Sequence, residues 1–287
     1  MASQSTQAQL LKNGGTRDSR RSLGRALSYG LVFLLVAGSL VAAAASYLSL
    51  KRELTQAAMV RNAAVAQLAA VTLAERLERM TDFAVSLATR VRFAELVADG
   101  RWTQAAEILR AIPGGFAQVE RLFLADAGGT LQADIPELPG VRGENFAHRA
   151  WFQGVSRAWQ PYVSPVYRRT AQPRVNVIAV AAPVRGRAPG TVAGVLVLQL
   201  SLETFFDWSN VIGLADGAAL VVVDPAGRAA FTSGVPLQAP AADLSKDPSV
   251  ARLRDGGRGT ELVRDSTEGA EWLQVYEPAR HGWGVIL

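Results

Sequence analysis

Two segments, LFLADAGG at residues 122–129 and LVVVDPAG at residues 220–227, have the same pattern. Each is an apolar run that ends in Asp-x-x-Gly and is followed by another β-rich run. The aspartate is expected to hydrogen-bond the backbone of its own turn, and the glycine to take the left-handed conformation that closes a hairpin. Two such hairpins at the openings of successive segments predict two tandem modules of one fold.

β-Branched and aromatic residues concentrate in further runs around these hairpins, and such runs indicate strands. In the first module the runs are 119–126, 161–168, 174–183 and 191–200. Thr170–Pro173 and Arg185–Gly190 carry turn signals between the last three runs, and the second of these turns predicts a hairpin. In the second module, strands are predicted from Ala218, at 260–264 and at 271–276.

Short helices are predicted beside these strands, around 102–112 before Pro113, at about 202–211 and near 249–253. The last residues, HGWGVIL at 281–287, have the composition of a strand, so we expect the natural protein to continue beyond Leu287. The pattern is typical of an α+β fold with antiparallel sheets.

A stripe of apolar residues at helical spacing precedes the strands and consists of Val65, Ala69, Leu73, Leu77, Met80, Ala84, Leu87 and Val91. Intervals of three and four residues place the stripe on one face of a long stalk helix. No proline occurs before Pro113, so this helix can continue without interruption from the segment before it. Two interpretations are open: the stripe pairs two chains as a heptad seam, or it covers a sheet of its own chain.

The segment Ala26–Leu50 contains no charged side chain over 25 residues. As a helix it would reach about 37 Å, which is enough to span a bilayer. The alternative is a cleaved secretory signal with a small-residue site at Ala42–Ala44, but the long basic lead and the continuation into a helix favour a retained anchor. With either interpretation, the rest of the chain lies outside the cytoplasm.

The net charge of +5 is concentrated at the N-terminus, where the first 25 residues hold five of the 30 basic side chains and one of the 25 acidic ones. Basic residues before the apolar segment predict a cytoplasmic N-terminus. The rest of the chain carries 25 basic and 24 acidic side chains, so it has no basic excess for nucleic-acid binding. The lipid bilayer is therefore an expected partner, and nucleic acid is not.

The sequence offers little for catalysis. It has no cysteine, no Gly-x-Ser-x-Gly elbow, no phosphate-binding Gly-rich loop and no His-Glu-x-x-His pair. His148 and His281 are the only histidines, so we expect no metal site and no cofactor. An anchored exported enzyme with its active site near Arg149 is an alternative that these absences disfavour.

One group of residues has the chemistry of a binding site. Arg149 and Phe152 lie one helical turn apart with Trp151 between them, and Tyr167 with its following arginines ends a predicted strand. A guanidinium among aromatic faces suits a small anion, because arginine presents a planar fork to a carboxylate and the rings exclude water. The alternative is that the aromatic residues belong to the core and Arg149 caps nearby carbonyls.

The residues Arg149-x-Trp-Phe152, Pro161–Ser164, Ala181–Val184 and Gly194–Leu202, preceded by the two helices, resemble the double Cache (dCache) sensor domain of bacterial membrane receptors. The resemblance covers about residues 54–287 and is most specific at 149–202. It implies two PAS-like modules on the stalk helix, with the ligand in the membrane-distal one. It also implies a bacterial inner-membrane receptor whose output after Leu287 is a histidine kinase, a diguanylate cyclase or a chemotaxis signalling domain.

In the amino-acid-binding branch of that family, Arg-x-Trp-Tyr binds the ligand carboxylate, and Tyr-x-Asp with a later Asp binds its ammonium group. Arg149, Trp151 and Tyr167 match, and Phe152 stands in place of the first Tyr. Arg169 and Gln199 stand in place of the two aspartates. Our hypothesis is therefore an anionic ligand, a mono- or dicarboxylate, held between Arg149 and Arg169 over Trp151 and Tyr167.

The predicted division of the chain is a cytoplasmic basic tail at 1–25, a transmembrane helix at 26–50, the stalk with a short helix at 51–111, a membrane-distal Cache module at 112–213 and a membrane-proximal one at 214–287 that is incomplete at its C-terminal end. A homodimer through the stalk helix is expected. A module that binds another protein and no small ligand is the alternative function.

Overall fold

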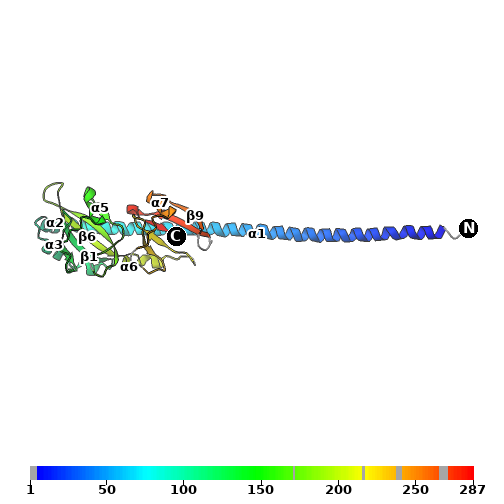
Figure 1. Ribbon diagram of the computed structural model, residues 1–287, viewed down its shortest axis with the longest axis horizontal. Coiled ribbons are helices and arrows are strands. Elements are labelled where there is room, and N and C mark those ends of the chain that lie inside the picture. Colours follow the sequence, from blue (N-terminus) through cyan, green and yellow to red (C-terminus); the bar gives the residue numbers. More distant parts are fainter. Residues whose placement is uncertain (1–4, 171, 215–216, 237–240, 265–270) are drawn as a thin grey trace. The chain divides into compact units, whose positions relative to one another are not determined.

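The computed structural model describes residues 5–170, 172–214, 217–236, 241–264 and 271–287 (Figure 1). It describes side chains from Phe33 onward, with those of Tyr29 and Leu31, but not those of Arg264 and Glu271. The basic side chains of the predicted N-terminal tail and residue 171 of the predicted turn lie outside this part. The chain divides into two compact units, residues 1–58 and 59–287.

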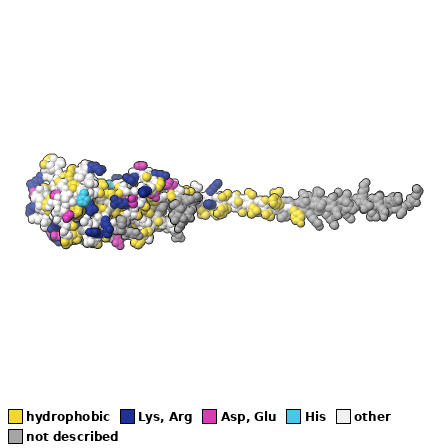
Figure 2. Space-filling view, viewed as in Figure 1, with side chains coloured by type: hydrophobic (Ala, Val, Ile, Leu, Met, Phe, Trp, Pro, Cys, Tyr) yellow, Lys and Arg dark blue, Asp and Glu magenta, His cyan; other side chains and the backbone are white. Residues whose placement is uncertain are grey.

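One continuous helix, α1 (Ser5–Ala88), contains both the apolar segment and the predicted stalk. Among the described residues, only this helix is long and apolar enough to cross a membrane, and one 18-residue window in it has a mean hydropathy of 2.0. Hydrophobic side chains cover its described apolar part (Figure 2), and Phe33 and Leu40 are 75% and 66% exposed. The uninterrupted helix expected from the absence of proline is confirmed.

The first sheet is antiparallel and has six strands in the order β2-β1-β6-β5-β3, with β4 also paired to β5. Its strands and the helices in the same stretch of chain are α2 (Val91–Ala98), α3 (Trp102–Ile108), α4 (Ile112–Gly115), β1 (Val119–Asp126), β2 (Leu131–Ile135), α5 (Ala150–Ala158), β3 (Tyr162–Val163), β4 (Tyr167–Arg168), β5 (Asn176–Arg185), β6 (Val192–Ser201), α6 (Leu202–Phe205) and the 3-10 helix η1 (Asp207–Val211).

The second sheet is also antiparallel, with five strands in the order β8-β7-β11-β10-β9. Its elements are β7 (Val221–Val223), β8 (Ala229–Thr232), α7 (Pro248–Arg254), β9 (Gly259–Arg264), β10 (Glu271–Pro278), the 3-10 helix η2 (Arg280–Gly282) and β11 (Gly284–Ile286). Two antiparallel sheets with flanking helices confirm the α+β class with two PAS-like modules.

Three predicted elements are divided in the structure. The run at 161–168 forms two short strands, β3 and β4, because Pro165 between them has no N–H to donate to a sheet. The helix expected at 202–211 is α6 followed by the 3-10 helix η1. The helix expected around 102–112 is α3 alone, and Pro113 lies inside the separate turn α4.

The apolar stripe of the stalk covers the sheets of its own chain. Leu73, Leu77 and Leu87 are fully buried in a core that also contains residues of both sheets. Val91 is the exception: α1 ends at Ala88, and Val91 begins α2 with 75% of its surface exposed. This part of the prediction was wrong, because a turn at 89–90 separates the two helices and rotates Val91 away from the core.

The first sheet is covered on both faces. Strand residues alternate between the faces, so Leu122 and Leu198 join the core with α1. Phe123 and Val197 join a second core with α5 on the other face. Both faces of β1, β5 and β6 are therefore apolar, which accounts for the nearly continuous hydrophobic runs in the sequence.

Both repeated turns form as predicted. Asp126 Oδ1 accepts hydrogen bonds from the backbone N–H groups of Gly128 and Thr130, each at 2.9 Å. Asp224 Oδ1 accepts the equivalent bonds from Ala226 and Arg228 at 2.9 and 2.8 Å. The closing glycines have the left-handed φ angles expected, +85° at 129 and +82° at 227.

A glycine in α5 sets how closely the helix approaches the sheet. A Cβ atom at Gly154 would lie 2.2 Å from a ring carbon of Tyr162. Replacing a helical glycine by alanine normally stabilises a helix by about 1 kcal/mol. For Gly154→Ala we expect instead a loss of about 1–3 kcal/mol from overpacking, measured by urea unfolding.

The matched control is Gly114→Ala in α4, where a Cβ atom would have no neighbour within 4 Å. We expect this variant to keep or increase the free energy of unfolding. Equal stability of Gly154→Ala and the wild type would show that α5 does not pack on Tyr162 as described.

Candidate functional site

Helix α5 positions the first two predicted site residues. Arg149 is its N-cap, with an extended backbone (φ −78°, ψ 145°), so its side chain leaves the helix at the N-terminal end. Trp151 is 2% exposed and meets the ring of Phe123 edge to face, with the centroids 5.3 Å apart. The arrangement brings the guanidinium group to the edge of the core between α5 and the sheet.

Strand β4 brings Tyr167 to the same place. The Cζ atom of Arg149 lies 5.8 Å from the centroid of the Tyr167 ring, a cation–π distance. Gln199 on β6 donates a hydrogen bond from Nε2 to the Tyr167 hydroxyl at 2.8 Å. Burial raises the pKa of Tyr167 to about 12, against smaller lowering effects of Gln199 and the nearby arginines. The phenol is therefore neutral at physiological pH.

These side chains surround a cavity of about 30 Å³. Five of the six predicted site residues line it: Arg149, Trp151, Tyr167, Arg169 and Gln199. Phe152 is not among the lining residues. It is 8% exposed and packs edge to face on Trp151 and Trp159 at 5.6 and 6.3 Å. Thr170 closes one side, where its hydroxyl accepts a hydrogen bond from Nη2 of Arg149.

Arg169 is less available than the sequence suggested. Its Nη1 pairs with Glu120 Oε1 at 2.5 Å, and its Nε donates to the carbonyl of Pro173 at 2.5 Å. A β-bulge between Val119 and Arg121 locates Glu120 at this point of β1. Arg169 lines the cavity with its charge already paired.

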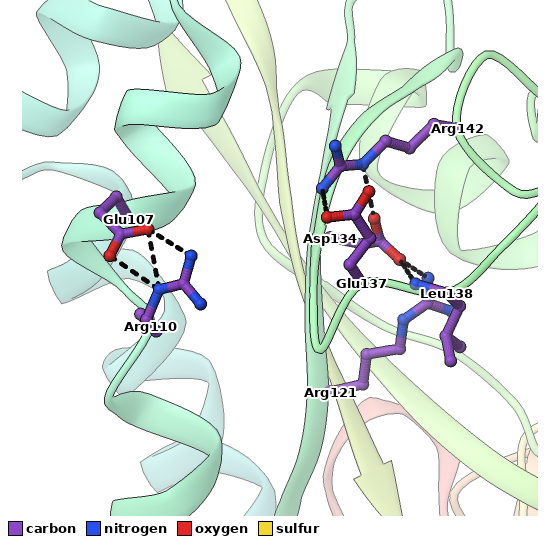
Figure 3. A network of polar contacts seen from close by, with 7 residues as sticks. All are labelled: Glu107, Arg110, Arg121, Asp134, Glu137, Leu138 and Arg142. Atoms are coloured by element: carbon purple, nitrogen blue, oxygen red, sulfur yellow. Dashed lines mark hydrogen bonds and ion pairs between the residues drawn. The ribbon is translucent and has the colours of Figure 1, made fainter.

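Arg121 is a cavity residue that the sequence analysis missed. It is 5% exposed, and its Nη2 pairs with the buried Asp134 at 2.5 Å. Asp134 also accepts hydrogen bonds from Nε of Arg142, at 2.9 Å, and from the backbone N–H of Leu138 (Figure 3). The sequence carried one sign of this role, because Arg121 is a charged residue within the largely apolar strand run at 119–126.

The charged side chains that line the cavity are arginines. Three arginines line it, and two of them, Arg121 and Arg169, pair with carboxylates. Among the described residues Arg149 has no carboxylate partner, and the hydroxyl of Thr170 is its hydrogen-bond acceptor. One guanidinium charge at the cavity is therefore available to a ligand.

The cavity is joined to the second module through the residue before Tyr167. Val166 donates its backbone N–H to Asp224 Oδ2 at 2.9 Å, and its carbonyl accepts Nη1 of Arg228 at 2.9 Å. We name this pair of contacts the Val166 clamp. In the first module the corresponding Asp126 Oδ2 accepts, within the described part of the chain, the local side chain of Gln132 at 2.8 Å and no group of the second module.

Asp224 is 1% exposed, and burial raises its pKa, against the lowering effect of its hydrogen bonds to Arg228, Val166 and Ala226. The hydrogen bonds that Asp224 accepts in its own turn and from the first module therefore offset part of the free-energy cost of burying this carboxylate. Since β7 leads into the turn and also pairs with the C-terminal strand β11, the clamp connects the cavity wall to the last strand of the chain.

Metal binding has no support in the described residues, since no three or more His, Cys, Asp or Glu side chains gather there as a metal site would need. His281 lies in η2 with a left-handed backbone (φ 59°), and burial lowers its pKa. His148 is exposed and next to Arg149, but it is not a lining residue of the cavity.

Comparison with known proteins gives matches in structure only. No family model and no curated protein matches the sequence. The ligand-binding domain of the Pseudomonas aeruginosa chemoreceptor PctC in complex with GABA is 20% identical, with a TM-score of 0.58 over 80% of this chain and 98% of that one. The ligand-binding domain of the Campylobacter jejuni chemoreceptor Tlp3 in complex with L-valine is 13% identical, with a TM-score of 0.60 over 83% and 94%.

A third similar structure is the extracellular domain of the putative histidine kinase mmHK1S-Z2. It is 15% identical, with a TM-score of 0.59 over 79% of this chain and 94% of that one. Two of these structures are ligand-binding domains of chemoreceptors, and the third is the extracellular domain of a putative histidine kinase. The chain therefore has the fold that these ligand-binding domains share, and the dCache resemblance inferred from the sequence is confirmed at the level of the fold.

The Val166 clamp can be tested by hydrogen exchange on the full chain in detergent micelles. Asp224→Asn leaves one carbonyl oxygen where the carboxylate has two, so it cannot serve both the turn and Val166. We expect the amide of Val166 to exchange about tenfold faster, as the loss of one buried hydrogen bond implies.

Asp126→Asn is the matched control, because the same turn in the first module makes no bond to Val166. It should leave exchange at Val166 unchanged. Arg228→Met, which removes the donor to the Val166 carbonyl, should act like Asp224→Asn. Wild-type exchange at Val166 in both second-module variants would exclude the clamp.

Proposed function

We propose that this chain is the extracytoplasmic sensor part of a bacterial signal-transduction receptor, and that its distal module binds a small anionic solute of the carboxylate type. The single observation that carries the proposal is the cavity at Arg149, Trp151 and Tyr167, in a fold shared with receptor ligand-binding domains.

The arginine fork supplies the attraction. Arg149 can present two parallel N–H groups to a carboxylate, and Trp151 and Tyr167 exclude water from the contact. The guanidinium of Arg149 now bonds Thr170, so a ligand carboxylate would replace that neutral acceptor with a charged one. Hydrogen bonds to charged groups are the stronger kind, which favours the exchange.

An amino-acid zwitterion fits less well. The PctC and Tlp3 domains are described with GABA and L-valine, both of which carry an ammonium group. In this chain the two positions that bind the ammonium group in the amino-acid-binding branch hold Arg169 and the neutral Gln199, and Arg121 also lines the cavity. Like charges 4 Å apart cost about 4 kcal/mol at an effective dielectric of 20. The pairing of Arg169 with Glu120 reduces this repulsion without providing a carboxylate in the cavity lining.

The apolar segment of α1 suits a membrane anchor. With the basic tail in the cytoplasm, the two sheets lie on the outer side of the inner membrane, where solutes are sampled without import. The same helix enters the core of the unit that begins at Met59. A change in that core therefore acts directly on the helix that crosses the bilayer.

Signalling then follows as a shift in population. A ligand that contacts Arg149 and Tyr167 changes the strand before Thr170, and the Val166 clamp couples that strand to β7 and β11. A shift from 1:99 to 99:1 requires about 5.5 kcal/mol of differential binding. We propose that the receptor signals through a histidine kinase, a diguanylate cyclase or a chemotaxis domain.

We also propose a homodimer through the stalk, formed by a face of α1 other than the predicted stripe. The predicted stripe is buried within the chain, whereas Ala64, Leu68, Val71 and Glu75 are exposed at intervals of four, three and four. Leu68 and Val71 are 59% and 49% exposed. This spacing suits a heptad seam with a second copy.

A second candidate function is favoured by the small size of the cavity. A volume of about 30 Å³ holds about one water molecule, so the cavity as it stands has little room for a solute, as expected of a protein-binding module without a small ligand. Binding of a solute therefore requires the Arg149 to Thr170 contact to open.

Ligand binding is tested by thermal unfolding of the full chain in detergent micelles. Sodium propionate or sodium succinate at a hundred times its Kd should raise Tm by about 5 °C. Glutamine and spermidine should not. Arg149→Met should abolish the shift, whereas Arg157→Met, an exposed arginine on the same helix, should retain it.

Stabilisation by amino acids or polyamines and not by carboxylates would refute the anionic assignment. No stabilisation by any of these solutes would support the protein-binding module.

The dimer is tested by cysteine crosslinking, for which the chain is well suited because it contains no cysteine. Single cysteines at 64, 68, 71 and 75 should crosslink strongly, and cysteines at 65, 72 and 79 on the flank of the helix weakly. A flat profile would argue against pairing. In spheroplasts, a membrane-impermeant maleimide should label a cysteine at position 79, which is exposed and lies outside the proposed seam, and protection there would contradict the proposed orientation.

A further inference from the structure

Two buried polar atoms beside the cavity have no hydrogen-bond partner in the part of the chain that the structure describes. They are Nε of Arg121 and Oε1 of Gln199. Both side chains line the cavity, and they are 5% and 3% exposed. Arg121 and Gln199 are also directly opposite each other on β1 and β6. The two side chains that carry the unpaired donor and the unpaired acceptor are therefore neighbours across β1 and β6.

Each side chain makes one buried polar contact through another atom. Nη2 of Arg121 pairs with Asp134 at 2.5 Å, and Nε2 of Gln199 donates to Tyr167 at 2.8 Å. Turning Arg121 would break its ion pair with Asp134. Turning the amide of Gln199 would let Oε1 accept from the Tyr167 hydroxyl and would leave a donor unpaired, so the orientation in the structure is the one that offers an acceptor. Oε2 of Glu120 also has no partner, but Glu120 does not line the cavity.

Buried polar groups in proteins are nearly always satisfied, so an unpaired donor and acceptor in a binding cavity indicate the chemistry of the ligand. A hydroxyl group satisfies both, because it accepts from the N–H of Arg121 and donates to Oε1 of Gln199. A carbonyl accepts but cannot donate. An ammonium group donates but cannot accept, and a methyl group does neither.

We propose that the cavity selects a small hydroxycarboxylate, with its carboxylate on Arg149 and its hydroxyl between Arg121 and Gln199. The inference rests on the proposed function, since it assumes that Arg149 binds a carboxylate. The cavity of about 30 Å³ takes one water-sized group, which matches a hydroxyl, and the carboxylate enters when Arg149 releases Thr170. These dimensions favour acids of a few carbon atoms.

A matched series of three-carbon acids tests the proposal by isothermal titration of the full chain in detergent micelles. Lactate, pyruvate, propionate and alanine share the carboxylate and differ at carbon 2, which carries a hydroxyl, a keto oxygen, hydrogen or an ammonium group. We expect lactate, in one enantiomer, to bind at least about tenfold more tightly than propionate or pyruvate, and alanine not to bind.

Gln199→Met keeps the length of the side chain and removes the acceptor. In this variant lactate should lose its advantage over propionate, while the Kd of propionate changes by less than about threefold, because Arg149 is intact. The wild-type series gives its answer even where the variant does not fold.

The possible outcomes separate the two proposals. Equal affinity for lactate and propionate would overturn the hydroxyl selection and leave carboxylate sensing in place. Tightest binding of pyruvate would show that this wall offers only donors, which also overturns the selection. Binding of alanine alone, or of none of the four acids, would overturn both the selection and the small-carboxylate proposal.

Discussion

Coverage of the first sheet on both faces is the constraint on which the rest of the structure depends. One face packs on α1 and the other on α5, so β1, β5 and β6 can carry polar side chains only where those side chains find partners or a cavity. Arg121 and Gln199 are the buried polar residues on the α5 face of β1 and β6. The cavity therefore lies where the apolar pattern of the sheet is interrupted, and the site is a consequence of the packing.

Much of the fold was predictable because it depends on local patterns. Strand β1 has the predicted bounds. The two Asp-x-x-Gly turns were predictable because the aspartate that accepts the hydrogen bonds and the groups that donate them are close together in the sequence. The uninterrupted α1 followed from the absence of proline. The division of the run at 161–168 was missed because the proline inside it, Pro165, was given less weight than the β-rich residues around it.

The candidate site was predictable in part, for a different reason. Family resemblance placed Arg149, Trp151 and Tyr167 together, and the structure brings them to one cavity. Partners distant in the sequence were not visible in this way. Glu120 reaches Arg169 only because of a β-bulge, and Arg121 pairs with Asp134 across two adjacent strands. Sequence spacing alone gives neither contact.

The repeated aspartate has a consequence for how the two modules are related. Asp126 uses its second oxygen within its own hairpin, whereas Asp224 uses it for Val166 in the other module. The modules share a fold but are not interchangeable: a chimera built from two copies of the first would retain both hairpins and lose the bond that joins them. After a duplication of one ancestral unit, a change of hydrogen-bond donor at a single carboxylate would have been enough to give the copies a fixed order along the chain.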